Sequence, residues 1–106
     1  MTKEVLDLSQ ITEQSARAAE LLKLLSNQHR LLILCHLIDG ELCVSDLEQR
    51  LAISQSSLSQ HLARLREQNI VEFRKQSTTV YYRVADPNVE KVLGTLYEIF
   101  CLADAS

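Results

Sequence analysis

The pattern of apolar and polar positions predicts five helices. Apolar side chains recur every three or four residues, the spacing of one helix face, over residues 11–25, 27–39, 44–51, 54–68 and 87–103. The stretch 27–39 is apolar almost all round, which is typical of a helix at the centre of a domain. Side chains that cap helix N-termini precede or begin four of the helices, at Thr12, Ser26, Ser54 and Asp86.

Between Asn69 and Pro87 the apolar residues change from helical spacing to the alternation of a strand. Apolar side chains alternate there with polar ones at Val71, Phe73, Val80, Tyr82 and Val84. The sequence RKQSTT between the two runs is polar, so residues 71–84 are predicted to form a two-stranded hairpin. Because an isolated hairpin is marginally stable in water, we expect it to pack against the helices as a wing.

Residues 44–68 have the organisation of a helix-turn-helix. A short helix, a tight turn at 52–54 and a helix with one polar face follow one another directly. Together with the hairpin they predict the order α-α-α-α-β-β-α, a mainly α fold with a small β-hairpin, which is a winged helix-turn-helix. The length suits one small domain, so we expect residues 1–106 to form a single domain in which 1–10 are flexible.

The helix 54–68 is the candidate DNA-reading element. Leu58, Leu62 and Leu65 form a narrow apolar stripe, and the other faces carry hydrogen-bonding side chains of the kinds that reach base edges and phosphates. We expect contacts with double-stranded DNA from this helix and the wing, at Gln55, Ser56, Ser57, Ser59, Gln60, His61, Arg64, Arg74, Lys75 and Thr78. A solvated amphipathic helix is the alternative interpretation.

The distribution of charge favours DNA binding. The net charge of the chain is −3, but residues 54–83 hold five Lys or Arg against two Asp or Glu. That segment therefore carries +3 and the rest of the chain −6. Basic charge at the motif attracts phosphate, whereas the acidic remainder limits nonspecific binding.

The composition narrows the class of protein further. No apolar run is long enough to span a membrane and no signal peptide is recognisable, so we expect a cytoplasmic protein with no membrane partner. Three cysteines, an odd number, argue against a disulfide framework and leave reactive, metal-binding or buried thiols as alternatives. The C-x-x-C pair of a thiol oxidoreductase is absent, so an enzyme is not expected.

The first and last predicted helices are more apolar than a domain of this size requires. The stripe of the last helix continues to its end, so we expect residues 87–104 to form a dimerisation helix. The predicted interface of the homodimer consists of Leu21, Leu22, Val92, Leu93, Leu96, Ile99 and Phe100. Packing within one domain is the alternative.

Three segments of the chain together match a known family. They are, in order, LLKLLSNQHRLLILCHL, GELCVSDLEQRL and SQSSLSQHLARLREQNIVEFRKQSTTVYYRV. Through them the chain resembles the ArsR/SmtB family of bacterial repressors over most of its length. The resemblance implies a homodimer that places the helix 54–68 in the major groove of operator DNA and the wing near the backbone or minor groove. It also implies a metal, metalloid or reactive sulfur inducer, sensed away from the DNA-reading helix.

The cysteines decide which inducer the resemblance implies. Arsenical and cadmium sensors of the family often have ELCVCDL, whereas this chain has ELCVSDL, which keeps Cys43 but has Ser45 in place of the second thiol. Zinc sensors carry histidine on the last helix, and residues 87–106 contain none. Cys35 and Cys101 stand where the dithiol branch, the BigR/SqrR/HlyU-like persulfide and redox sensors, has its cysteine pair.

The resemblance therefore implies a repressor without a cofactor, whose DNA affinity falls when sulfane sulfur or another thiol oxidant oxidises or cross-links Cys35 and Cys101. A plainer interpretation of each thiol, and of Cys35 above all, is a small buried apolar residue. Cys101 lies beside the apolar stripe of its helix, so it is expected to be partly accessible. Cys43 is expected to be a spectator, because nearby Glu41 and Asp46 disfavour a thiolate there. A metal- or metalloid-responsive repressor that uses Cys43 is the alternative.

Overall fold

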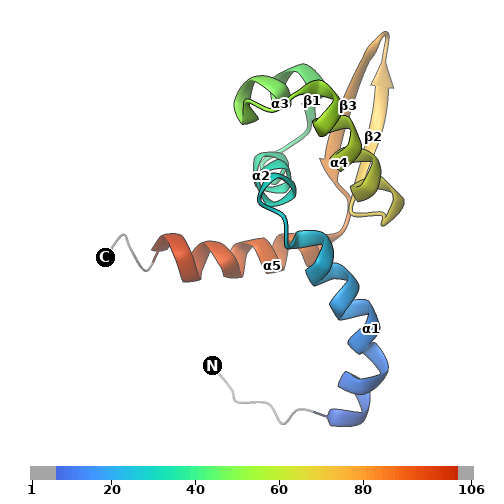
Figure 1. The fold of residues 1–106 in the computed structure, drawn as a ribbon, viewed down its shortest axis with the longest axis vertical. Coiled ribbons are helices and arrows are strands. Elements are labelled where there is room, and N and C mark those ends of the chain that lie inside the picture. Colours follow the sequence, from blue (N-terminus) through green and yellow to red (C-terminus); the bar gives the residue numbers. More distant parts are fainter. Residues whose placement is uncertain (1–6, 103–106) are drawn as a thin grey trace.

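The computed structural model describes residues 7–102, and Figure 1 shows its helices and strands. Their order is α1 (Leu8–Leu25), α2 (Gln28–Leu37), β1 (Leu42–Cys43), α3 (Val44–Leu51), α4 (Gln55–Glu67), β2 (Val71–Gln76), β3 (Thr79–Val84), α5 (Pro87–Tyr97) and the π-helical turn η1 (Glu98–Leu102). Helices α2, α3 and α4 gather with the sheet in one body, from which α1 and α5 extend in different directions. This arrangement confirms the predicted winged helix-turn-helix.

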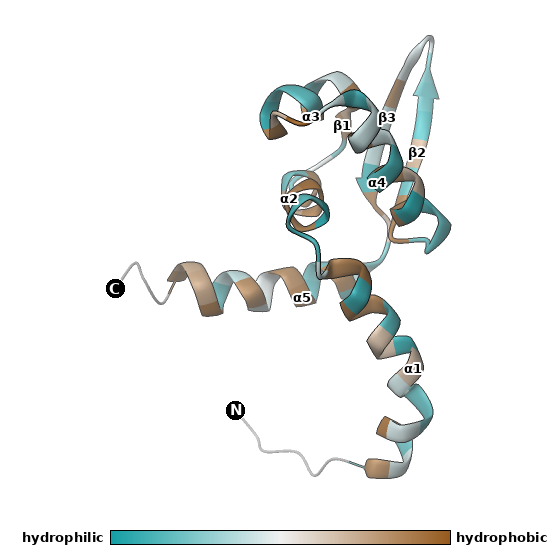
Figure 2. Ribbon diagram, in the orientation of Figure 1, coloured by the Kyte–Doolittle hydropathy of each residue, from teal (hydrophilic) through white to brown (hydrophobic). Residues whose placement is uncertain are grey.

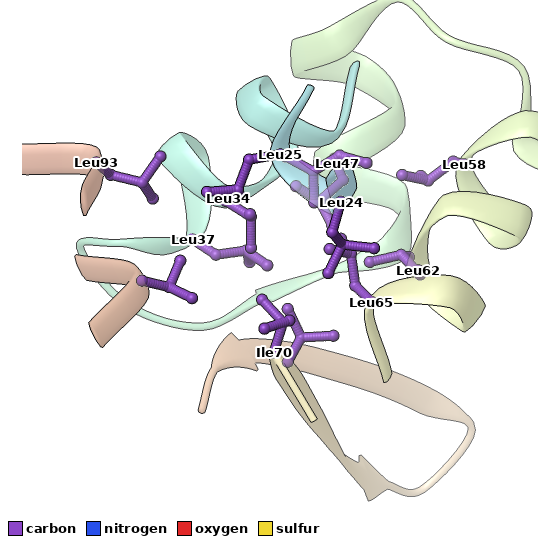
Figure 3. Packing of buried hydrophobic residues seen from close by; sticks show 13 residues of the cluster. Leu24, Leu25, Leu34, Leu37, Leu47, Leu58, Leu62, Leu65, Ile70 and Leu93 are labelled. Carbon is purple, nitrogen blue, oxygen red and sulfur yellow. The ribbon is translucent and has the colours of Figure 1, made fainter. Parts of the chain in front are cut away.

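The core consists of apolar side chains from all five α-helices and from the start of β2. In Figure 3 the α2 residues Leu34 and Leu37 lie between Leu93 of α5 and the leucines of α4. The predicted stripe of α4 is fully buried, with Leu58, Leu62 and Leu65 at most 1% exposed. Burying each of these side chains stabilises the fold by roughly 1.5–3 kcal/mol. The inner face of α4 is thereby fixed, and its polar face is turned outward.

Helix α1 begins earlier than the sequence predicts. The carboxylate of Asp7, not the hydroxyl of Thr12, caps it by accepting hydrogen bonds from the backbone N–H groups of Ser9 and Gln10. Thr12 lies inside the helix, where its hydroxyl donates to the carbonyl of Leu8 over 2.7 Å. Residues 8–10 are therefore helical, residues 1–6 lie outside the described part, and the flexibility expected for 1–10 stays a prediction.

Helix α2 also has a different cap and a shorter extent than predicted. Asn27, which has an extended backbone, accepts a hydrogen bond from the N–H of Arg30 over 3.0 Å, whereas Ser26 ends α1. The helix stops at Leu37 rather than at residue 39. Gly40 follows with a φ of 150°, which other residues rarely adopt. Only one face of α2 is buried, so it is not the wholly buried helix that its composition predicts.

The local signals around the helix-turn-helix are confirmed. Ser54 caps α4, since its hydroxyl accepts a hydrogen bond from the N–H of Ser57 over 3.2 Å. Ala52 has a left-handed backbone, with φ of 51°, and turns the chain between α3 and α4. Asn69 ends α4 in the same conformation, with φ of 59°. The two helices are therefore set at their angle by short-range interactions.

The wing is a three-stranded antiparallel sheet in the order β1-β3-β2, not the two-stranded hairpin predicted. Strands β2 and β3 pair from Val71 with Val84 to Gln76 with Thr79. The added strand β1 pairs Leu42 with Tyr82 of β3. A strand of two residues has no detectable periodicity, so only its tertiary pairing defines it. It ties the link after α2 to the wing.

The last helix and α1 extend from the body of the domain. Asp86 caps α5 as predicted, and the helix passes at residue 98 into η1, while the predicted end at 103–104 lies outside the described residues. The radius of gyration is 15.8 Å, against about 13 Å for a compact chain of this length. Figure 2 shows apolar residues along both extended helices. No helix within residues 7–102 combines the length and apolarity needed to cross a membrane.

Candidate nucleic-acid interface

The outward face of α4 is a row of short polar side chains. Because the leucine stripe is buried, the opposite side of the helix is exposed, and it presents Gln55, Ser56, Ser59 and Gln60. The first turn contains no acidic residue, so nothing on it repels phosphate. Side chains of this kind donate to and accept from base edges in a groove. Four of the predicted DNA contacts are thus brought together on one accessible surface.

Two further predicted contacts, Ser57 and His61, are half-buried on the flank of α4 that faces α2. The ring of His61 lies 5.9 Å from that of His29, centre to centre. Partial burial lowers the pKa of His61, and the charges of Arg30, His29 and Arg64 lower it further. Burial and the neighbouring positive charges therefore favour the neutral form of His61, at the junction of α2 with the DNA-reading helix.

Arg64 lies on the same flank, at the end of α1. With Lys23, Glu20 and Glu67 it lines a shallow hollow, so its position differs from that of the outward polar row. Partial burial of Arg30 lowers the pKa of its guanidinium, and the charge of Arg64 lowers it further. The guanidinium of Arg30 donates to the carbonyl of Leu24 and thereby satisfies the C-terminal end of α1.

The wing presents Lys75 and Thr78 to solvent. A two-residue turn, with Ser77 at a φ of 59°, connects β2 to β3 and exposes Thr78. Side chains alternate along a strand, so Lys75 lies on the same face of β2 as Phe73. That face is turned towards α4, because the guanidinium of Arg66 stacks over the Phe73 ring at 4.3 Å. Lys75 and the outward face of α4 therefore border the same space.

Arg74 lies on the opposite face of the wing and is already paired. Its guanidinium forms an ion pair with the carboxylate of Glu41 and stacks over the ring of Tyr81 at 4.6 Å. Arg83 of β3 is likewise paired with Glu72 of β2. The wing therefore carries less available positive charge than the count along the sequence indicates, and Lys75 supplies it without an ion-pair partner among residues 7–102.

Sequence reasoning missed two residues of this surface. The sequence identifies Arg66 only as one of the basic residues of the segment 54–83, and nothing in the helical pattern shows that its side chain reaches the wing. Glu41 stands in a link whose pairing with β3 cannot be seen from the sequence. Both contacts join segments that are distant along the chain, so periodicity carries no signal for them.

Cys35 on α2 and Cys101 on η1 are both exposed. The interpretation of Cys35 as a buried apolar residue is therefore wrong within one chain, and the predicted accessibility of Cys101 is confirmed. Partial burial raises the pKa of Cys35, and the charge of Cys101 raises it further. The second effect requires the two thiols to be near one another, although they are far apart in sequence.

Cys43 is in a different environment. Its thiol donates to the Oδ2 atom of Asp46 over 3.3 Å and lies 3.2 Å from the hydroxyl of Ser45. Within residues 7–102 no three or more His, Cys, Asp or Glu side chains are grouped as they would be around a metal ion. Cys43 thus has the carboxylate neighbour that the sequence indicates.

The residues predicted for dimerisation divide into exposed, half-buried and buried groups. Leu22, Ile99 and Phe100 are 62%, 55% and 67% exposed, whereas Leu21, Val92 and Leu96 are half-buried. Leu93 belongs to the core of its own chain, with 6% exposure. We call α1 and the continuous segment α5–η1 the two arms of the protein. They expose further large apolar side chains, at Leu8, Ile11, Tyr97 and Leu102.

The fold and the outward polar face of α4 define the class of a winged helix-turn-helix DNA-binding protein. The model of the bacterial regulatory proteins of the arsR family matches residues 27–72. The transcriptional activator HlyU of Vibrio cholerae serotype O1 is 42% identical over 99 residues, which are 93% of this chain and 92% of HlyU. The chain belongs to the ArsR family, and it is a regulator of transcription rather than an enzyme.

Solved structures agree with this assignment. The transcriptional repressor BigR from Xylella fastidiosa has a TM-score of 0.86 and 38% sequence identity, over 91% of this chain and 98% of BigR. Reduced HlyU from Vibrio cholerae N16961 has a TM-score of 0.82 and 43% identity, over 87% of this chain and 97% of HlyU. Both similarities agree with the resemblance to the BigR/HlyU-like branch of the family.

Proposed function

We propose that the protein is a cytoplasmic repressor that binds operator DNA as a homodimer and releases it when Cys35 and Cys101 are joined. One observation supports the switch above all. Both thiols are exposed, and the charge of Cys101 reaches Cys35 strongly enough to contribute to its raised pKa. An exposed dithiol is open to a reagent from solution, and an electrostatic effect of one thiol on the other supports their proximity.

The DNA-binding surface of this proposal consists of the outward face of α4 together with Lys75 and Thr78 of the wing. Gln55, Ser56, Ser59 and Gln60 read bases in the major groove, while Lys75 and Thr78 contact the backbone. In a dimer the two copies of α4 read half-sites about 34–36 Å apart, one turn of DNA. The operator is therefore expected to be a pseudo-palindrome.

The dimer explains why α1 and α5 extend from the body. Their arms expose large apolar side chains such as Leu22, Ile99 and Phe100, each more than half accessible in one chain. Large apolar side chains gathered on such exposed helices are costly in water and are normally covered by a partner. A second copy brings a matching surface, because a two-fold interface uses the same patch twice.

The switch is a two-electron oxidation of the dithiol by polysulfide. One cysteine thiolate attacks a terminal sulfane sulfur, becomes a persulfide, and releases a polysulfide one sulfur shorter. The second thiolate then attacks the cysteine sulfur of that persulfide, which forms the disulfide and expels HS⁻. If both cysteines are first persulfidated, attack of one on the other yields a trisulfide and HS⁻. The extra sulfur suits thiols held apart, since a direct disulfide needs Cα atoms within about 7 Å.

A bond between α2 and η1 affects DNA binding because each belongs to a different part of the protein. Helix α2 packs behind α4 through the core, and η1 continues the arm proposed for dimerisation. Joining them changes how the two copies of α4 are spaced relative to one another. A coupling of about 1–3 kcal/mol lowers DNA affinity by about 5- to 150-fold.

The test uses the full chain, reduced and handled without oxygen. The probe is the DNA that lies upstream of the gene encoding this protein. Fluorescence anisotropy and intact-mass spectrometry follow treatment with sodium polysulfide, hydrogen peroxide, diamide, zinc and arsenite. We expect polysulfide to release the DNA and to add one intramolecular bridge. Cys35→Ser and Cys101→Ser should bind DNA without releasing it.

Cys43→Ser is the matched control, and it should respond as the unaltered chain does. Loss of the response in Cys43→Ser alone would refute the dithiol switch. Release by zinc or arsenite, but not by polysulfide, would instead favour the metal- or metalloid-responsive repressor. Intact mass distinguishes the two cases because only the dithiol reaction adds a bridge to the protein.

A further inference from the structure

Each of the three nitrogens of the Arg74 guanidinium donates a hydrogen bond to another side chain of the protein. Its Nε atom donates to both carboxylate oxygens of Glu41, over 3.0 and 2.9 Å, and its Nη2 atom donates to one of them. Its Nη1 atom donates to the side-chain oxygen of Gln76 over 2.8 Å. A phosphate approaching Arg74 therefore finds the Nε/Nη2 edge of the guanidinium, one of the edges that can bind an anion through two hydrogen bonds, already engaged by a carboxylate.

The pairing follows from the topology of the sheet. Strand β3 lies between β1 and β2, and Tyr81 stands opposite Cys43 on one side and Arg74 on the other. Residues in register share a face, and Glu41, two residues before Cys43, shares it too. The carboxylate and the guanidinium thus meet across the middle strand, over the ring of Tyr81.

The ion pair between Arg74 and Glu41 has several hydrogen bonds but is exposed to solvent. The side chains of Arg74 and Glu41 remain 50% and 33% accessible. Hydrogen bonding to Arg74 lowers the pKa of Glu41, which favours the charged form of the carboxylate. An exposed pair is weak enough in water for another anion to replace one partner.

We propose that Glu41 competes with DNA phosphate for Arg74, and so limits the affinity of the wing for the DNA backbone. The inference rests on the proposed DNA-binding function. It assigns to Glu41 the position that a phosphate oxygen pair would take at the guanidinium. Arg74 then contributes little to binding in the unaltered chain, in contrast to Lys75, which has no carboxylate partner among residues 7–102.

The experiment measures the binding of the full chain to a fluorescein-labelled, mixed-sequence DNA duplex, because phosphate contacts are independent of sequence. Titrations at several salt concentrations between about 50 and 200 mM give both affinity and salt slope. Glu41→Gln should tighten binding about two- to fivefold, the factor that an exposed ion pair is worth. The salt slope should steepen by about one unit, because Arg74 would then bind one more phosphate.

Arg74→Gln separates the competition from a simple loss of negative charge. By itself it should weaken binding less than about twofold, whereas in the Glu41→Gln background it should remove the whole increase in affinity. Glu13→Gln, which makes the same charge change on an exposed position of α1, is the matched control and should leave the affinity nearly unchanged. Thermal unfolding of each variant checks that the fold is intact.

Two outcomes overturn the inference alone. In the first, Glu41→Gln binds no more tightly than the unaltered chain, and in the second, its higher affinity persists in full after Arg74→Gln. A chain that shows no salt-dependent binding to any duplex would overturn the proposed function and this inference with it. The three results are distinguishable within one set of titrations.

Discussion

The guanidinium carbon of Arg66 lies 4.3 Å from the centre of the Phe73 ring. Arg66 stands in the last turn of α4, and Phe73 is the third residue of β2, so the contact joins the DNA-reading helix to the wing. Phe73 is also 6.0 Å from the ring of Tyr82 on β3. One cation–π contact therefore joins the wing to α4, and the aromatic pair lies within the wing, between β2 and β3.

This contact predicts a measurable coupling between helix and wing. In a double-mutant cycle, Arg66→Met and Phe73→Leu should lower the free energy of unfolding with a coupling of about 0.5–1 kcal/mol. The substituted leucine would keep the apolar contact but lose the face of the ring. Urea unfolding followed by circular dichroism measures the four stabilities. Arg74→Met with Phe73→Leu is the control cycle and should be additive, because Arg74 lies on the opposite face of the sheet.

Substitutions in the two parts of the DNA-binding surface, α4 and the wing, should change DNA binding in different ways. Gln60→Ala removes a side chain of the outward face of α4, so it should lower the preference for the operator by about 1–3 kcal/mol for the base pair it reads. Binding to unrelated DNA should change little. Competition titrations with operator and mixed-sequence duplexes measure this ratio. An equal loss on both duplexes would argue that Gln60 contacts only phosphate.

Lys75→Ala should weaken the binding of all sequences alike and reduce the salt slope by about one. The reason is that a phosphate contact carries no sequence information, but releases a counterion. Lys91→Ala removes the same charge from α5 and is the matched control. If both variants bind with equal affinity and slope, the wing does not contact DNA.

The exposed arms predict a stable dimer. Phe100→Glu should yield a folded monomer, because Phe100 is 67% exposed within one chain. Leu93→Glu should instead unfold the protein, since Leu93 is only 6% exposed and a charge there would be buried. Sedimentation velocity and circular dichroism separate dissociation from unfolding. A monomeric unaltered chain at micromolar concentration would contradict the dimer.

His61 predicts that stability falls in mild acid. Its folded pKa is lowered, by burial first and then by Arg30, His29 and Arg64, so the unfolded chain binds the proton more tightly. Stability should therefore rise with pH from the folded pKa up to about 6.5, the ordinary value, and this dependence should end above it. Urea midpoints between pH 5 and 8 measure the effect. His61→Gln should flatten the curve, and a curve that keeps its slope in His61→Gln would contradict this assignment.

The sequence alone determined the local structure. Ser54, Asn69 and Asp86 set the ends of α4 and the start of α5, because a capping side chain or a left-handed backbone acts within a few residues. The leucine stripe of α4 likewise identified its buried face and, by difference, the polar face available to DNA. These signals are short-range, so they can be followed along the chain. They were sufficient to predict the winged helix-turn-helix, whereas the family followed from the resemblance of three segments of the sequence.

Tertiary structure decided what the local signals leave open. Strand β1 exists only because the link after α2 meets β3, and this meeting brings Glu41 to Arg74. The cation–π contact of Arg66 with Phe73 also joins segments that are distant along the chain. So does the electrostatic effect of Cys101 on Cys35, which no spacing along the chain indicates. A charge count along the chain finds the cations of the wing, but pairing across the sheet decides which of them remain available. Contacts between distant segments depend on how the core assembles, and therefore they appear only in the folded chain.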